Sequence, residues 1–424
     1  MINYFKSHRS NLLKIFYVLI TFLICKALTF LAPLKIFDLI ESANEYGLFE
    51  FNLNLAQTLS AVFGVGLTGS YGYFITKKEL VSYKPIFHFH FILISSILIV
   101  ISLAFPHITN NTIFQSIVLA NVFANQIFIS GYLKLNNKTL FSIIIDTGVY
   151  LLMGVFIMSA IIEHDYFNTQ FWFFSCFLYL ILIQLFFHLP KLKGFNQIEA
   201  NVYKEVYLFG IIAAISGPLL FLITASTRLY IEYFLDLGSV ATYSVIFRIL
   251  SIILIVSRVS SILLYKRMFV NTHSYLDKNY SIILVFVFLS SVLCFFLIPM
   301  ALEYFDEKYL MLIQNNPLIY KLSYLQIYLW INISLFEVLF LRENLLKKFL
   351  LITSIVTTLL FISLITFDYF EETSIVTILF TNVFALLLLL KLQFFYLNKY
   401  VYFYRYTFYT TLFSIILLTF LCYA

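Results

Sequence analysis

The stretch GSVATYSVIFRILSIILIVSRVSSILLYKR, residues 238–267, can cross a bilayer as one helix, at about 1.5 Å per residue against a hydrocarbon core of about 30 Å. It nevertheless carries Arg248 well inside and Arg258 nearer its end. An arginine at mid-membrane costs about 3 kcal/mol on insertion scales, so a chain retains one where it faces water, a ligand or a partner. The two arginines lie about 15 Å apart along the axis and about 80° apart around it. We therefore expect this side of the helix to line a water-filled path for a negatively charged ligand.

The composition of the whole chain agrees with a protein built in a membrane. Of its 424 residues, 62% are hydrophobic and only 11% are charged. Soluble folds do not have so little polar surface, and the apolar runs of about 20 residues lack the alternation of strands. The chain is therefore predicted to be an all-α, polytopic membrane protein. Its net charge of +6 comes from short loops, so we expect a lipid bilayer and no nucleic acid as its partner.

Hydropathy predicts twelve spans and a possible thirteenth. They fall near 11–34, 47–75, 85–106, 112–133, 139–162, 168–189, 206–229, 239–265, 280–300, 318–341, 348–368 and 373–396, with a last run at 405–423. Basic residues recur in every second loop, and the alternate loops are acidic or neutral, such as ESANEYG (41–47) and FDYFEET (367–373). By the positive-inside rule the N-terminus is cytoplasmic.

The polar linker KLKGFNQIEANVYKE (191–205) divides the chain into two sets of six spans. We assign residues 1–195 to an N-terminal lobe, 196–398 to a C-terminal lobe and 399–424 to an additional membrane segment. A faint repeat supports two pseudo-symmetric lobes, since NEYGLFEFNLNLAQTLSAV in the second span aligns with GSVATYSVIFRILSIILIV in the eighth. In that alignment Asn54 matches Arg248. Two repeats around a shared midplane site are a common transporter architecture, so we expect a central cavity between the lobes.

Three stretches resemble the Wzx-type polysaccharide (O-antigen) flippases of the multidrug/oligosaccharidyl-lipid/polysaccharide (MOP) exporter superfamily. They are EYGLFEFNLNLAQTLSAVFGVGL (45–67), TRLYIEYFLDLGSVATYSVIFRI (227–249) and EYFDEKYL (303–310). Arg228 matches the arginine at the junction of the seventh and eighth helices in that family, and Arg248 matches a later basic position. The acid that usually precedes the junction arginine is Thr227 here.

Four buried cations are candidate ligands for a diphosphate: Arg248, Lys26, Arg258 and Arg228. Lys26 lies about 22 Å into the first span, too deep to reach the cytoplasmic surface. Each cation also has a simpler interpretation. Arg248 could pair with a backbone carbonyl or a neighbouring acid, and Lys26 with a buried acid. Arg258 could snorkel to the surface, and Arg228 could snorkel or pack between the lobes.

Polar side chains without charge, and one acid, complete the candidate site. Asn54, Asn121 and Asn125 could contact a glycan, or they could bond to neighbouring helices. Asp146, inside the fifth span, could carry a coupling proton or sodium ion, or it could neutralise a buried cation. No motif for a metal, a nucleotide or catalysis occurs, so no metal, cofactor or catalytic residue is expected beyond a proton or sodium gradient.

The resemblance implies a transporter, not an enzyme. It implies alternating access that moves an undecaprenyl-diphosphate-linked oligosaccharide, an O-antigen (lipopolysaccharide) or capsule repeat unit, across the bacterial inner membrane, with other polysaccharide assembly proteins as candidate partners. Two alternatives stay open. One is a drug/cation antiporter of the same superfamily, which buried arginines disfavour. The other is a membrane-embedded polysaccharide polymerase, which usually has a large outer loop that this chain lacks.

Overall fold

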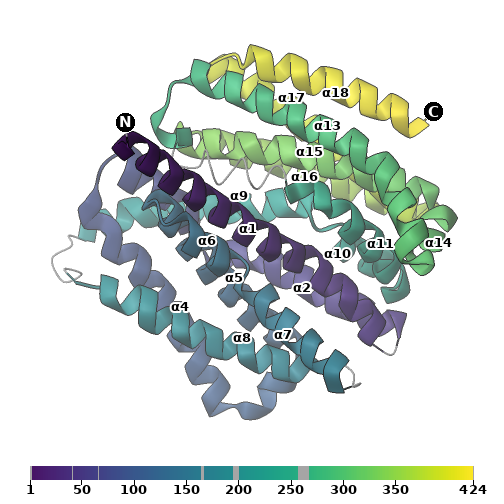
Figure 1. Ribbon diagram of the computed structural model, residues 1–424, viewed down its shortest axis with the longest axis horizontal. Helices are drawn as coiled ribbons and strands as arrows, with labels where there is room; N and C mark the ends of the chain where they lie inside the picture. The colour runs from purple at the N-terminus through teal and green to yellow at the C-terminus, as the bar shows by residue number, and fades with distance from the viewer. Residues whose placement is uncertain are drawn as a thin grey trace.

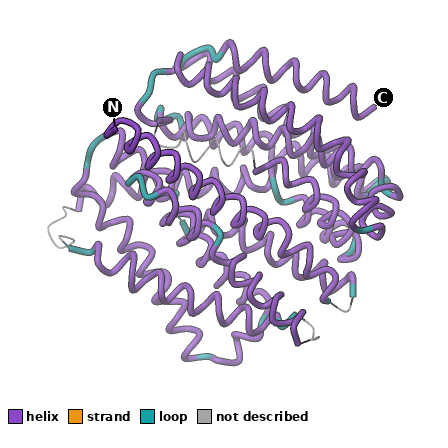
Figure 2. The backbone as a smooth tube through the Cα atoms, viewed as in Figure 1, coloured by secondary structure: helices purple, strands orange, loops and turns teal. Residues whose placement is uncertain are grey.

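The computed structural model describes residues 2–40, 42–64, 66–163, 167–193, 200–255 and 267–423. Throughout these residues the chain forms helices and short connections, with no strand (Figure 2). Side-chain caps start several helices: Ser42 accepts from Glu45 N, Asn111 from Ile113 N, and Asp236 from Ser239 N. Each cap supplies an acceptor to a backbone N–H that has no partner within the helix. The prediction of an all-α protein is confirmed.

The first half contains eight α-helices with short π and 3₁₀ segments between them. They are α1 (Ile2–Leu39), α2 (Ala43–Phe63), α3 (Leu67–Tyr71), η1 (Gly72–Lys77), η2 (Val81–Tyr83), α4 (Lys84–Ala104), η3 (Pro106–Asn110), α5 (Thr112–Leu135), α6 (Thr139–Asp146), α7 (Gly148–Glu163), α8 (Thr169–Ile183), η4 (Gln184–His188) and η5 (Leu189–Lys191).

The second half is also helical. Its elements are α9 (Ala200–Thr224), α10 (Thr227–Phe234), α11 (Leu237–Leu250), η7 (Ser251–Ile253), α13 (His273–Phe305), α14 (Glu307–Asn315), α15 (Pro317–Arg342), α16 (Leu346–Tyr369), α17 (Ile375–Tyr400) and α18 (Arg405–Tyr423). Every span predicted from the sequence contains a helix, and the last run, 405–423, corresponds to α18.

The helices form two lobes, each with its own apolar core (Figure 1). Helices α4–α8 lie in one lobe and α13–α18 in the other, with α1, α2 and α9–α11 between them. The predicted boundary at 195/196 lies outside the described residues. The second predicted boundary, 398/399, falls just before the end of α17.

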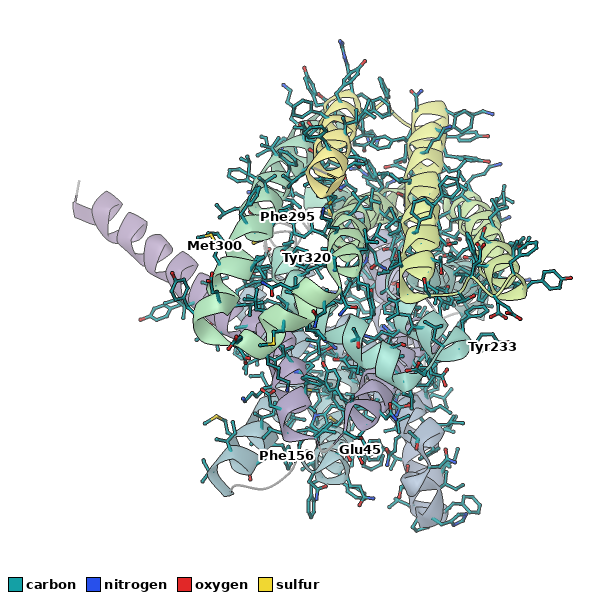
Figure 3. All side chains as sticks on the ribbon, turned by 90° about the vertical axis from the view of Figure 1, so that its right-hand side faces the viewer. Glu45, Phe156, Tyr233, Phe295, Met300 and Tyr320 are labelled. Carbon is teal, nitrogen blue, oxygen red and sulfur yellow. The ribbon has the colours of Figure 1, made fainter. Side chains whose placement is uncertain are left out.

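Ten helices in the described part of the chain are long and apolar enough to span a membrane, and the bent pair α6–α7 adds an eleventh. Apolar side chains such as Met300 project from the surface of these helices (Figure 3). The predicted second and eighth spans, α2 and α11, do not pass this test. Helix α2 is too polar, because it carries four side-chain amides as well as two glutamates, and α11 is described only to Ile255. The chain is a multi-pass membrane protein.

Helix α2 packs directly against α11, so the two segments related by the sequence repeat meet at the interface between the lobes. Gly47 permits this approach, because a Cβ at that position would lie 2.0 Å from the carbonyl oxygen of Leu237. Such a contact is impossible for any other residue without moving a backbone. The helices that position the site are therefore held together by close backbone packing.

Candidate functional site

The centre of the lobe interface is a buried ion pair between Glu50 on α2 and Arg248 on α11. Arg248 donates from Nε to Glu50 Oε1 at 2.9 Å and from Nη2 to Oε2 at 3.0 Å. The glutamate is fully buried and the arginine is 9% exposed. Two parallel bonds of this kind are strong and directional. They connect the N-terminal lobe to a helix of the second half.

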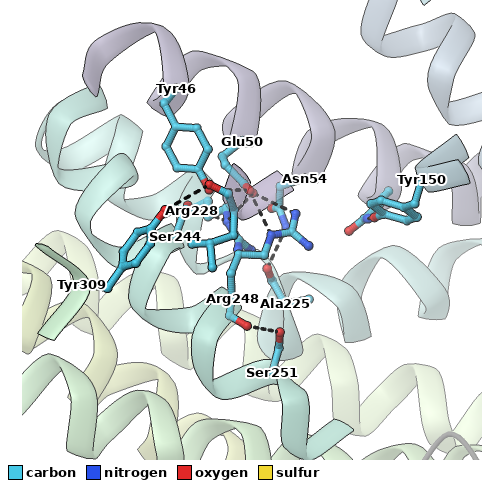
Figure 4. A network of polar contacts seen from close by, with 12 residues as sticks. Tyr46, Glu50, Asn54, Tyr150, Ala225, Arg228, Ser244, Arg248, Ser251 and Tyr309 are labelled. Atoms are coloured by element: carbon cyan, nitrogen blue, oxygen red, sulfur yellow. Dashed lines mark hydrogen bonds and ion pairs between the residues drawn. The ribbon is translucent and has the colours of Figure 1, made fainter. Parts of the chain in front are cut away.

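A second guanidinium, from Arg228 on α10, also contacts Glu50 (Figure 4). Its Nε lies 3.2 Å from Glu50 Oε2 and donates to Ser244 Oγ at 2.7 Å. The guanidinium lies over the ring of Phe247, with its Cζ 4.9 Å from the ring centroid. The phenol of Tyr46 donates to Glu50 Oε1 at 3.1 Å. One carboxylate thus accepts hydrogen bonds from Arg248 and Tyr46 and forms an ion pair with Arg228.

This cluster carries more positive than negative charge. Arg228 and Arg248 bring two charges and Glu50 one, and no other acidic side chain of the described residues contacts the two arginines. Arg228 Nη2 is buried and has no hydrogen-bond partner among the described residues. A buried donor without a partner costs about 1–3 kcal/mol, and more when it is charged. The cluster therefore has the capacity to bind a further anionic or acceptor group.

Asn54 lies one turn beyond Glu50 on the same helix. Its Nδ2 donates to the carbonyl of Ala225 at 2.9 Å, where α9 ends, and its Oδ1 is buried without a partner among the described residues. Thr58, on the next turn, contacts Ser226 Oγ at 3.2 Å. One face of α2 therefore presents a carboxylate, an amide and a hydroxyl to the α9–α10 junction. Asn54, a predicted glycan contact, lies beside the arginines.

Lys26 and Asp146 form a separate pair in the N-terminal lobe. Lys26 Nζ lies 2.7 Å from Asp146 Oδ2, and the lysine side chain is 6% exposed. Asp146 ends α6, and the chain bends by 58° before α7 begins at Gly148. Gln126 connects the two sides of the bend, donating to the carbonyl of Asp146 and accepting from Val149 N. The structure thus pairs Lys26, a predicted diphosphate ligand, with Asp146, the predicted coupling acid.

The remaining predicted residues lie elsewhere. Asn121 and Asn125 are fully buried within the N-terminal lobe, where both donate to Ser95 Oγ on α4. Arg258 lies outside the described residues. Ser251, three residues after Arg248, donates to the backbone carbonyl of that arginine at 2.7 Å. Of the eight predicted site residues, the structure brings together Arg228, Arg248 and Asn54.

Sequence reasoning missed Glu50 and Tyr46, although both lie in the quoted stretch 45–67. The signal was an acid inside an apolar span, one turn before an asparagine that aligns with Arg248. A buried acid of this kind requires a cation. Which cation could not be read from the chain, because Glu50 and Arg248 are 198 positions apart.

Two further polar contacts join the lobes near their ends. Next to the acidic loops, Lys308 Nζ and Tyr309 OH reach Asp38 Oδ1 at 3.1 and 3.3 Å. Burial, together with the nearby carboxylate of Asp38, raises the pKa of the Tyr309 phenol, so it remains a donor. At the opposite end, Lys77 Nζ lies 3.3 Å from Glu343 Oε2 and donates to the carbonyl of Arg342. The lobes are in contact at both ends.

The fold defines a class: a helical membrane protein of two lobes, an architecture that solved structures of other membrane proteins share. The chain is similar to the solved structure of a multidrug resistance MATE family transporter of the MOP superfamily in an outward-facing conformation. The two are 13% identical, with a TM-score of 0.56, over 91% of this chain and 94% of the other. A MATE protein in complex with MaL6 is also similar, with a TM-score of 0.50 and 13% identity over 91% and 95% of the two chains. At this identity the likeness establishes the fold. The sequence matches no protein-family model and no curated protein.

Proposed function

We propose that this chain is a flippase that moves a polyprenyl-diphosphate-linked oligosaccharide across the bacterial inner membrane, with its N-terminus in the cytoplasm. The observation that carries the proposal is the Glu50 cluster: two guanidiniums share one carboxylate, and one buried N–H of Arg228 has no partner among the described residues. A site with excess positive charge, enclosed between two lobes of a transporter-like fold, favours an anion.

The proposed substrate presents a physical problem that this arrangement addresses. A diphosphate and its sugars cannot cross hydrocarbon, whereas the polyprenyl tail remains in it. Planar guanidiniums bind phosphate oxygens by the same two-point geometry as carboxylate oxygens. A diphosphate that enters between the lobes can therefore replace Glu50 as the partner of Arg248 and Arg228. Asn54, with its buried amide oxygen, is placed to receive a hydrogen bond from the neighbouring sugar.

In this mechanism Glu50 acts as an internal substitute for the substrate. When no diphosphate is bound, it neutralises one arginine charge and holds α2 against α11. When the substrate arrives, the exchange of one anion for another breaks the contact between lobes and leaves the buried arginines partnered. The lobes can then move apart and release the substrate on the opposite face, by alternating access.

The pair of Lys26 and Asp146 is our candidate for energy coupling. A proton on Asp146 would cancel its charge and weaken its hold on Lys26, whose Nζ is 2.7 Å away. The pair lies at the bend between α6 and α7. Interrupted membrane helices often mark sites of ion binding or motion in transporters. Lys26 itself contributes no excess charge while Asp146 is ionised.

A drug/cation antiporter is the second candidate, because the similar solved structures are those of MATE proteins, one of them a multidrug resistance transporter. In such a protein Glu50 would bind a cationic substrate directly. Here its carboxylate already forms ion pairs with two guanidiniums and accepts a hydrogen bond from a phenol, so a cation would have to displace fixed charges of its own sign.

Reconstituted vesicles distinguish the two functions. The lipid-linked oligosaccharide is placed in one leaflet, and its arrival in the other is followed with a lectin; efflux of a fluorescent lipophilic cation is measured in a parallel sample. The proposal predicts lectin binding that depends on the protein, and no dye efflux. Dye efflux without movement of the glycolipid would overturn it in favour of the antiporter.

A further inference from the structure

The outside of the C-terminal lobe contains an apolar groove that the proposed function does not use. At one end of it, α13, α14 and α15 border a cavity of about 350 Å³. A second cavity, of about 510 Å³, follows α13 toward the middle of that helix and shares Phe296 with the first. Together they extend along α13 from Leu289 to Pro299, which is about 15 Å at 1.5 Å per residue. That length equals one leaflet, or half of a hydrocarbon core of about 30 Å.

A proline within α13 shapes the floor of the groove. Pro299 has no backbone N–H, so the carbonyl oxygen four residues earlier, that of Phe295, lacks its helical donor. The hydroxyl of Tyr320 on α15 donates to this oxygen at 3.1 Å. The rings of Phe295 and Tyr320 also contact each other, with centroids 5.7 Å apart, and Figure 3 shows both side chains in this part of the lobe. The floor is therefore a fixed part of the fold.

Helix α14 forms a wall of the groove and also contacts the other lobe. Its Leu310 and Ile313 line the cavity. Its Lys308 and Tyr309 reach the carboxylate of Asp38 on α1, at 3.1 and 3.3 Å. One helix of nine residues thus connects the contents of the groove to a contact between the lobes.

The end of the groove beside α14 carries a positive charge. Two polar side chains, Gln314 and Lys321, belong to the lining there. Lys321 has no ion-pair partner in the part of the chain that the structure describes. By contrast, Lys35 and Lys308, at the same end of the molecule, both pair with Asp38. The groove therefore combines a long apolar surface with one cation that is free to bind an anionic group.

We infer that the groove binds one anionic phospholipid, with its phosphate at Lys321 and Gln314 and an acyl chain along α13. Both α13 and α15 are long and apolar enough to span a membrane, so the groove between them faces lipid. A groove as long as one leaflet fits an acyl chain, and a lysine at the headgroup end favours an anionic headgroup over a zwitterionic one. In the proposed orientation this lipid lies in the outer leaflet. It is a bound component of the protein and is not transported.

The bound lipid has a structural consequence for α14. A helix of nine residues has little stability of its own, so it depends on what it packs against. An acyl chain in contact with Leu310 and Ile313 holds α14 in the position from which Lys308 reaches Asp38. The lipid thus supports the contact between the lobes at this end.

Native mass spectrometry of the purified full-length protein tests the binding. Phosphatidylglycerol and phosphatidylcholine with identical chains are added in detergent. We expect one phosphatidylglycerol to be retained per chain, with about tenfold higher affinity than phosphatidylcholine. Its binding should also slow amide hydrogen exchange in residues 307–315, because a ligand of the folded state suppresses local opening. Equal retention of the two lipids, or unchanged exchange in α14, would overturn the inference.

Variants assign the lipid to this groove. Lys321→Gln should abolish the preference for phosphatidylglycerol, and Gln314→Glu, which places a negative charge at the same edge, should do so as well. Lys278→Gln is the matched control, because this exposed lysine lies on α13 at the opposite end from the groove. Leu293→Trp puts a larger side chain into the groove from an exposed position and should weaken the binding of both lipids. An undiminished preference in both Lys321→Gln and Gln314→Glu would contradict the assignment.

Competition separates this lipid from the proposed transported one. A polyprenyl diphosphate should leave phosphatidylglycerol bound, because its proposed ligands, Arg228 and Arg248, lie between the lobes. Displacement of phosphatidylglycerol that persists in Arg248→Ala would assign the groove to the transported lipid and overturn the inference. A failure of glycolipid transport in vesicles leaves the retention of phosphatidylglycerol unaffected. The two proposals therefore fail separately.

Discussion

Glu50 on α2 and Arg248 on α11 are joined by two hydrogen bonds, of 2.9 and 3.0 Å, across the interface between the lobes. The pair is buried, and a second arginine, Arg228, contacts the same carboxylate. If the lobes separate during transport, this contact has to break. An anionic substrate can break it at low cost because it offers the arginines an equivalent partner.

The cluster predicts unequal effects of removing its members. Glu50→Gln leaves two buried guanidiniums without a counter-charge, whereas Arg248→Met leaves one ion pair, Glu50 with Arg228. Loss of one partner of a buried pair costs about 3–5 kcal/mol when it leaves a charge uncompensated. Thermal unfolding in detergent should therefore show a larger loss of stability for Glu50→Gln than for Arg248→Met. The opposite order would mean that Glu50 is not the counter-ion of both arginines.

Glu50→Gln should lower the stability of the protein but raise its affinity for the ligand. It removes the internal competitor, so a polyprenyl diphosphate should bind the variant more tightly than the wild type, by about tenfold. Binding is measured on the fraction of protein that remains folded. Weaker binding to Glu50→Gln would show that the carboxylate supports the substrate and does not compete with it.

The close approach of α2 to α11 gives a purely steric prediction. In Gly47→Ala the new methyl group would lie 2.0 Å from the carbonyl oxygen of Leu237, so the two helices must separate. We expect reduced stability and increased labelling of a cysteine placed at Ser244, which is fully buried beside the cluster. Gly154→Ala is the control, because its nearest atom would be a terminal methyl group of Leu28 3.1 Å away, which can move. Equal labelling of the two variants would contradict the packing described.

The pair of Lys26 and Asp146 allows a structural role to be separated from coupling. Asp146→Asn should destabilise the protein, and the double variant Lys26→Met, Asp146→Leu should recover much of the loss, since buried pairs can often be replaced by apolar residues. If the pair also couples transport to a gradient, the stable double variant should flip substrate without responding to the gradient. A gradient response equal to that of the wild type would restrict the pair to a structural role.

Orientation in the membrane is tested by reporter fusions. The loop charges predict cytoplasmic signals for fusions at 78, 192 and 345, and periplasmic signals at 165 and 370. Helix α18 is long and apolar enough to cross the membrane; if it does, a fusion at Ala424 should report the periplasm. A well-expressed fusion in the wrong compartment would contradict the assigned topology.

The sequence was sufficient for the helices, because apolar runs of about 20 residues have few alternatives in a bilayer. The repeat relating residues 44–62 to 238–256 indicated two corresponding helices, and the structure packs them together. A single sequence does not show the direction in which polar side chains point. Asn121 and Asn54 both lie in apolar spans, yet one points into its own lobe and the other toward α9. That choice depends on helix rotation, which hydropathy does not fix.

The proposed flippase mechanism requires Arg248 and Arg228 as ligands of a diphosphate, and equilibrium binding tests this directly. Purified wild type, Arg248→Ala, Arg228→Ala and the exposed control Arg405→Ala are titrated with a polyprenyl diphosphate and with the uncharged polyprenol. We predict that the wild type and Arg405→Ala prefer the diphosphate. Each buried-arginine variant, shown to be folded by tryptophan fluorescence, should lose about tenfold or more of its affinity for the diphosphate and none for the polyprenol. Folded Arg248→Ala and Arg228→Ala proteins that bind the diphosphate as tightly as the wild type would contradict the account.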